Sequence, residues 1–97
     1  MKQTERIMEM ERRLERASTV VIKLSAALEQ YADAQEDIRE LEAYYGSEEW
    51  KRDYADDEAG KLPDDLKRGV LSEDGVWNLL SDNRDLKERM LNMVKKQ

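Results

Sequence analysis

A ladder of apolar residues, with no glycine or proline inside it, fills the first half of the chain and most constrains its fold. It runs from residue 7 to residue 45 in alternating steps of three and four, with one gap. Such steps place the residues on one helical face, at the a and d positions of a heptad repeat. The ladder therefore predicts one long helix over residues 4–45. Its members are Ile7, Met10, Leu14, Ala17, Val21, Leu24, Leu28, Tyr31, Ile38 and Tyr45.

Glycine and serine mark the end of this helix and the start of a short connector, residues 47–71. Gly46 suits the position after a helix, where left-handed dihedrals are needed, and Ser47 suits the N-cap of the next helix. A short helix ending near Gly60 follows, with Trp50 and Tyr54 on one face. The stretch "LPDDLKRG", residues 62–69, predicts one or two further turns.

A last helix is predicted over residues 73–95, with Ser72 as its N-cap. Leu71 and Val76 have the spacing of a hydrophobic staple, whereas Gly75 in the first turn costs about 1 kcal/mol relative to alanine. The fold class is therefore all-α: a long N-terminal helix, a short helical connector and a C-terminal helix packed back antiparallel, as a coiled coil or helical bundle. The whole chain, residues 1–97, is expected to form a single domain. The apolar stripe of the last helix is Val76, Leu79, Leu80, Leu86, Met90, Met93 and Val94.

Composition narrows the function classes. Charged residues make up 41% of the chain and the net charge is −6, which argues against a general nucleic-acid binder. The sequence contains no cysteine, so no thiolate nucleophile is available. It contains no histidine, so no imidazole can act as a general base or as a metal ligand. No cofactor is expected. Apolar runs long enough for a membrane span or a signal peptide are missing, so we expect a cytoplasmic protein with no membrane partner.

The N-terminal third of the ladder is the first candidate interaction surface. If the last helix packs against residues 22–46, the apolar face of the residues that precede this range has no partner within the chain. An exposed apolar face of this length normally binds another subunit. The sequence therefore predicts a homodimer that self-associates through Ile7, Met10, Leu14, Ala17 and Val21.

Aromatic residues cluster at the end of the long helix and form the second candidate. Large rings with a polar edge suit both protein interfaces and the ends of helical cores. Two interpretations stay open: a structural plug over the helix end, or a platform that binds an unidentified protein partner. The residues concerned are Tyr44, Tyr45, Trp50 and Tyr54, with Trp77 joining them from the last helix.

Paired carboxylates leave an enzymatic alternative. Asp37 and Glu40 share one helix face, and so do Asp82 and Asp85, so together they could hold Mg²⁺ for nucleotide pyrophosphate hydrolysis. Another alternative is an acidic inhibitor that mimics nucleic acid, because ten acidic and five basic residues leave a charge of −5 over residues 46–75. Of these three function classes, we favour a non-enzymatic interaction or structural module over the hydrolase and the acidic inhibitor.

Three irregular stretches resemble a small bacterial family known only as a domain of unknown function, numbered 4298. They are "YYGSEEW" at residues 44–50, "DEAGKLPDDLKRGVLSEDG" at 57–75, and "LLSDNR" at 79–84. The resemblance, with its YYGS and LKRGVLSEDG signatures, extends over nearly the whole chain. The resemblance implies a bacterial cytoplasmic protein and brings no established activity.

Overall fold

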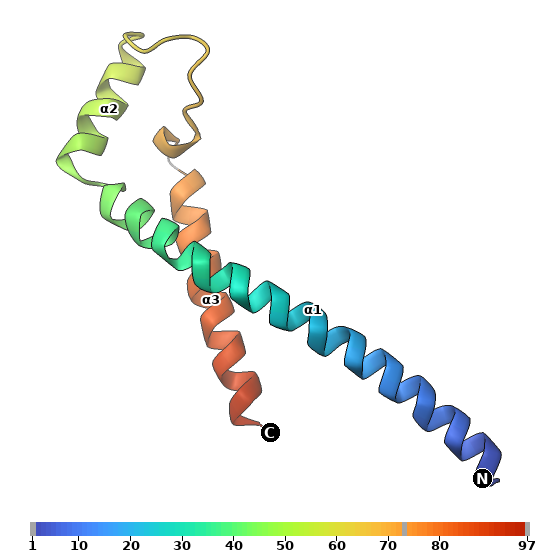
Figure 1. The fold of residues 1–97 in the computed structure, drawn as a ribbon. Helices are drawn as coiled ribbons and strands as arrows, with labels where there is room; N and C mark the ends of the chain where they lie inside the picture. Colours follow the sequence, from blue (N-terminus) through green and yellow to red (C-terminus); the bar gives the residue numbers. More distant parts are fainter. Residues whose placement is uncertain (1, 73, 97) are drawn as a thin grey trace. The chain divides into compact units, whose positions relative to one another are not determined.

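The computed structural model describes residues 2–72 and 74–96, and within them the chain is helical and contains no strand (Figure 1). The all-α prediction, with a long first helix, a short helical connector and a last helix, is confirmed. The chain divides into two compact units, residues 1–36 and residues 37–97, and α1 runs from the first into the second. The elements are α1 (Gln3–Tyr44), α2 (Glu48–Glu58), η1 (Gly69–Leu71) and α3 (Gly75–Lys95).

Local capping chemistry separates α1 from α2, as the sequence predicts. Gly46 adopts a φ of 82°, in the region that favours glycine, and the Ser47 backbone N–H donates to the Tyr44 carbonyl oxygen at 3.0 Å. The Ser47 hydroxyl then accepts from the Trp50 backbone N–H at 3.1 Å, which caps α2. Gly60, with a φ of 72°, follows the end of α2.

The connector after α2 forms one turn of the one or two that the sequence predicts over residues 62–69. In this turn the Leu66 backbone N–H donates to the Pro63 carbonyl oxygen at 3.2 Å, and Gly69 then opens η1. The Arg68 guanidinium lies 3.0 Å from an Asp57 carboxylate oxygen and ties the connector back to α2.

Ser72 joins η1 to α3. Its backbone is extended, and its hydroxyl donates to the Gly69 carbonyl oxygen at 2.8 Å and accepts from the Gly75 backbone N–H at 3.0 Å. The sequence predicts Ser72 as the N-cap of a helix that begins at residue 73, but α3 begins at Gly75 and its N-cap is Asp74, whose side chain forms no capping hydrogen bond. Residue 73 lies outside the described residues.

The second unit holds the small core of the protein. The buried apolar side chains of the described chain are Ile38, Leu71 and Val76, contributed by the end of α1, by η1 and by the first turn of α3. Leu71 and Val76 are the two residues predicted to form a hydrophobic staple. Further along α3, Leu80 and Asn83 line an open groove together with Glu42 of α1, so the last helix returns to the end of the first.

Candidate interaction surfaces

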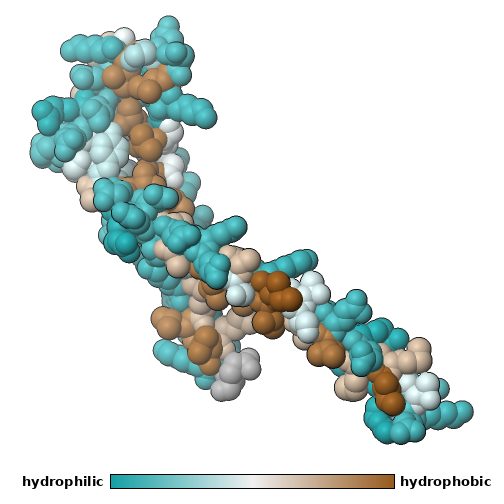
Figure 2. All heavy atoms as spheres, in the orientation of Figure 1, coloured by the Kyte–Doolittle hydropathy of each residue, from teal (hydrophilic) through white to brown (hydrophobic). Residues whose placement is uncertain are grey.

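The N-terminal part of α1 presents the predicted self-association residues on one helical face, which we call the seam. Ile7, Met10, Leu14 and Val21 are each between 52% and 66% exposed, and Ala17 between them is exposed as well. Figure 2 shows apolar side chains along this unit with hydrophilic ones beside them. None of the described residues 2–36 is buried. The first unit therefore has an apolar face but no core of its own.

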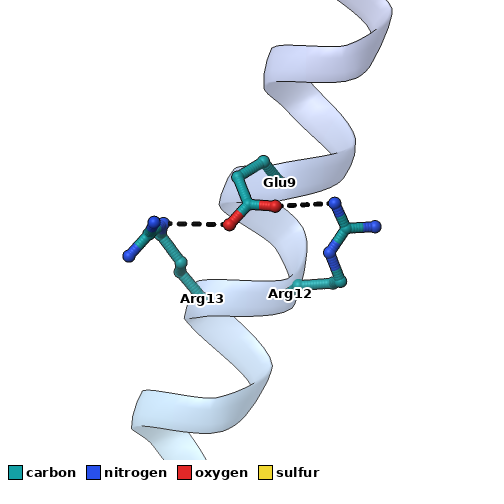
Figure 3. Close-up of polar contacts among 3 residues, drawn as sticks. All are labelled: Glu9, Arg12 and Arg13. Carbon is teal, nitrogen blue, oxygen red and sulfur yellow. Dashed lines mark hydrogen bonds and ion pairs between the residues drawn. The ribbon is translucent and has the colours of Figure 1, made fainter.

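Charged residues on the neighbouring surface of α1 pair with one another. The Glu9 carboxylate accepts from Arg12 at 2.6 Å and lies 3.2 Å from the Arg13 guanidinium (Figure 3). The hydrogen bond from Arg12 lowers the pKa of Glu9 below its ordinary value. These exposed pairs support the helix only modestly.

Three rings of the second unit, those of Tyr45, Trp50 and Tyr54, form an aromatic cluster where α1 meets α2. The Trp50 indole meets the Tyr45 ring edge-on, with centroids 5.2 Å apart, and stacks on the Tyr54 ring at 5.3 Å. The indole N–H donates to the Val70 carbonyl oxygen at 2.9 Å, which links α2 to η1. Such ring pairs contribute about 0.5–1.5 kcal/mol beyond the area they bury. These internal contacts are those expected of a structural plug, which is one of the two interpretations that the sequence leaves open; the other is a binding platform.

Tyr44 forms a second link across the same corner. Its hydroxyl donates to an Asp53 carboxylate oxygen at 2.6 Å. This hydrogen bond, with desolvation and the charges of Asp53 and Glu49 adding to it, raises the pKa of Tyr44 to about 12. The proton of Tyr44 therefore holds the end of α1 against α2.

The raised pKa predicts a loss of stability in alkali. An unfolded tyrosine ionises near pH 10, whereas folded Tyr44 keeps its proton to about 12. Its contribution is fully present below pH 10 and disappears as the pH rises through 12. We expect the free energy of unfolding to fall more steeply over this interval in the unchanged chain than in Tyr44→Phe, as measured by urea titrations at a series of pH values. Equal slopes for the two proteins would contradict the assignment.

Trp77 does not join this corner, and the prediction that it does is wrong. The indole is 57% exposed, whereas the preceding residue, Val76, is 4% exposed. Successive residues of an α-helix point about 100° apart, so burying Val76 turns Trp77 toward solvent. The predicted group of five aromatic residues is therefore reduced to Tyr44, Tyr45, Trp50 and Tyr54, all of them half-buried.

The carboxylates of the enzymatic alternative do not form a site. Asp37 and Glu40 on α1 and Asp82 and Asp85 on α3 are all exposed. Across residues 2–72 and 74–96, no group of three or more acidic side chains is placed to hold a metal ion.

A second apolar surface lies on the C-terminal half of α3, where sequence reasoning assigned the side chains to packing on the first helix. Leu86, Met93 and Val94 are exposed, and so is Leu91, which the predicted stripe does not include. Lys87, Met90, Leu91 and Val94 line an open, apolar depression of about 380 Å³ on this helix. In the described part of the chain, no helix is long and apolar enough to cross a bilayer.

Comparison with known proteins identifies the family of this chain but no activity. The family model described as Domain of unknown function (DUF4298) matches residues 7–93, which include the seam and the aromatic corner. Neither the curated proteins nor the solved structures contain a match to this chain.

Proposed function

This chain belongs to the family described as Domain of unknown function (DUF4298), and we propose that it is a non-enzymatic interaction module that self-associates through the seam of α1. The observation that carries the proposal is the complete absence of buried residues from the described part of the first unit, residues 2–36, beside an apolar face at heptad spacing. A bacterial cytoplasmic setting, implied by the family resemblance, is part of the same proposal.

The heptad spacing of the seam also indicates the kind of partner that it fits. A second copy is the partner we favour, because an a/d ladder is complementary to itself.

Burial of the seam would also contribute a driving force for the association. A side chain such as leucine or isoleucine contributes about 1.5–3 kcal/mol when it moves from full exposure to full burial. Ile7, Met10, Leu14 and Val21 are each more than half exposed, so each retains a large part of that gain for a partner. The half-buried aromatic corner is bonded internally and ranks below the seam as a contact for an unidentified protein.

Mass measurement across concentration tests the proposal. Light scattering or sedimentation from about 1 μM to about 100 μM should show twice the 11.4 kDa of one chain at the upper end and dissociation on dilution. A chain that stays monomeric at about 100 μM overturns the proposal. Saturable binding of a nucleoside triphosphate with Mg²⁺ in calorimetry would instead support the hydrolase alternative.

A further inference from the structure

The first helix carries charges whose spacing specifies how two copies meet. Resting on the proposed self-association, we infer that residues 7–28 of two chains pair as a parallel, in-register, two-stranded coiled coil in which Arg6 of each copy meets Glu11 of the other. The core layers would come from Ile7, Met10, Leu14, Ala17, Val21, Leu24 and Leu28.

The flanking charges favour the parallel direction. With Ile7 at position a and Met10 at position d, Arg6 is at position g and Glu11 at the next position e, five residues later. In a parallel pair, residue g of one helix faces residue e five positions later on the other. The in-register arrangement therefore forms two symmetric Arg6–Glu11 pairs at the start of the coil.

The antiparallel direction offers no such pairs. Antiparallel helices set g against g and e against e. Over the same segment, Arg6 would then face Ala27 or Ala34, and Glu11 would face Ser18 or Ser25, depending on register. A shorter overlap brings Glu11 against its own copy, which is repulsive. Charge complementarity therefore separates the two directions.

Pairing within the chain leaves these particular charges available. Arg13, the next residue at position g, is already beside Glu9 at 3.2 Å in its own helix (Figure 3). By contrast, neither Arg6 nor Glu11 has an ion pair among the residues that the structure describes. A second copy can therefore engage both without breaking an existing contact.

Part of the core agrees with two parallel strands. β-Branched side chains at a and leucine at d favour parallel dimers. Ile7 and Val21 at a and Leu24 at d follow this rule, whereas the other core layers, Leu14 and Leu28 at a and Met10 and Ala17 at d, do not. Ala17 at d leaves a shallow depression lined by Arg13, Val20 and Val21, where the helices can approach closely. One consequence is that both copies of the second unit follow the same end of the coil.

Disulfide cross-linking tests the direction, since the chain contains no native cysteine. In a parallel in-register pair, Met10→Cys and Val21→Cys each bring two thiols together across the core. We expect each variant to cross-link to itself at least about 100-fold faster than a variant whose thiols meet only by collision, because pairing raises their effective concentration to millimolar. Ile22→Cys, next to Val21 but outside the seam, is the matched control.

The outcomes distinguish direction from association. The native mass of each variant is measured under reducing conditions beforehand. A dimer in which Met10→Cys cross-links to Val21→Cys, but neither cross-links to itself, would establish an antiparallel pair and overturn this inference while keeping the proposed function. A dimer with no cross-link of either kind overturns the inference as well. A monomeric mass would overturn the proposed function.

Discussion

We expect Val21→Glu to dissociate the proposed dimer at concentrations where Ile22→Glu leaves it intact. The two residues are adjacent, both β-branched, and 66% and 70% exposed in the single chain, so exposure alone does not distinguish them. The heptad places Val21 in the seam and Ile22 outside it. Both substitutions add the same charge to the same turn of α1. A difference between them therefore reports on the seam alone.

The expected difference is large because a symmetric interface counts each substitution twice. Burying one valine contributes about 1.5 kcal/mol or more, so removing two costs about 3 kcal/mol, or at least about 100-fold in the dimer dissociation constant. Two glutamates brought together in an apolar interface add repulsion and desolvation. For Ile22→Glu we expect a change of about twofold at most.

Sedimentation equilibrium measures both dissociation constants, and circular dichroism verifies that α1 stays helical in both variants. Equal weakening by the two substitutions would show that α1 associates through a broad apolar surface and not through the seam. If Val21→Glu did not weaken the dimer, the seam would not be part of the interface.

Gly75→Ala should destabilise the second unit even though alanine favours helices. A Cβ atom at residue 75 would lie 2.7 Å from the Gly69 carbonyl oxygen and 2.8 Å from the Ser72 hydroxyl oxygen. The Gly69 carbonyl oxygen and the Ser72 hydroxyl are themselves hydrogen-bonded and join η1 to α3. The methyl group must therefore push the two elements apart beside the buried Leu71 and Val76.

We expect Gly75→Ala to lower the free energy of unfolding by about 1–3 kcal/mol, the range for overpacking a fitted site, despite a gain of about 1 kcal/mol in helix propensity. Gly69→Ala is the matched control, since a Cβ atom there meets nothing within 4 Å. It should change stability by about 0.5 kcal/mol or less. Urea titrations followed by tryptophan fluorescence, at one protein concentration, compare them. Equal stability of the two variants would show that the junction between η1 and α3 accommodates a methyl group at residue 75.

Gly75 also illustrates what a sequence can and cannot explain. In a helical window the residue is merely unfavourable, and nothing nearby in the sequence gives a reason for it. The reason is the backbone of Gly69, six residues earlier, which the turn at Ser72 brings against the first turn of α3. The second glycine of the "GVLSEDG" stretch is therefore explained by a close approach of two backbones.

The aromatic corner was predictable in part. The four-residue spacing of Trp50 and Tyr54 is sufficient to place their rings on one face of α2, and the stacked rings confirm it. The hydrogen bond from Trp50 to the Val70 carbonyl oxygen joins residues twenty apart in the chain, so no local pattern predicts it. The exclusion of Trp77 likewise follows from the choice of Val76 as the buried residue of the first turn of α3.

The sequence alone determined the long helix, its end at Gly46, the cap at Ser47 and the apolar face of the first unit. Each of these depends on periodicity or on interactions within about four residues, which the local chain encodes directly. Tertiary structure decided the course of residues 61–71, the pairing of Arg68 with Asp57, the orientation of Trp77 and the need for glycine at residue 75. These depend on which distant groups meet around the small core of Ile38, Leu71 and Val76, and burial there outweighs the weaker local preferences.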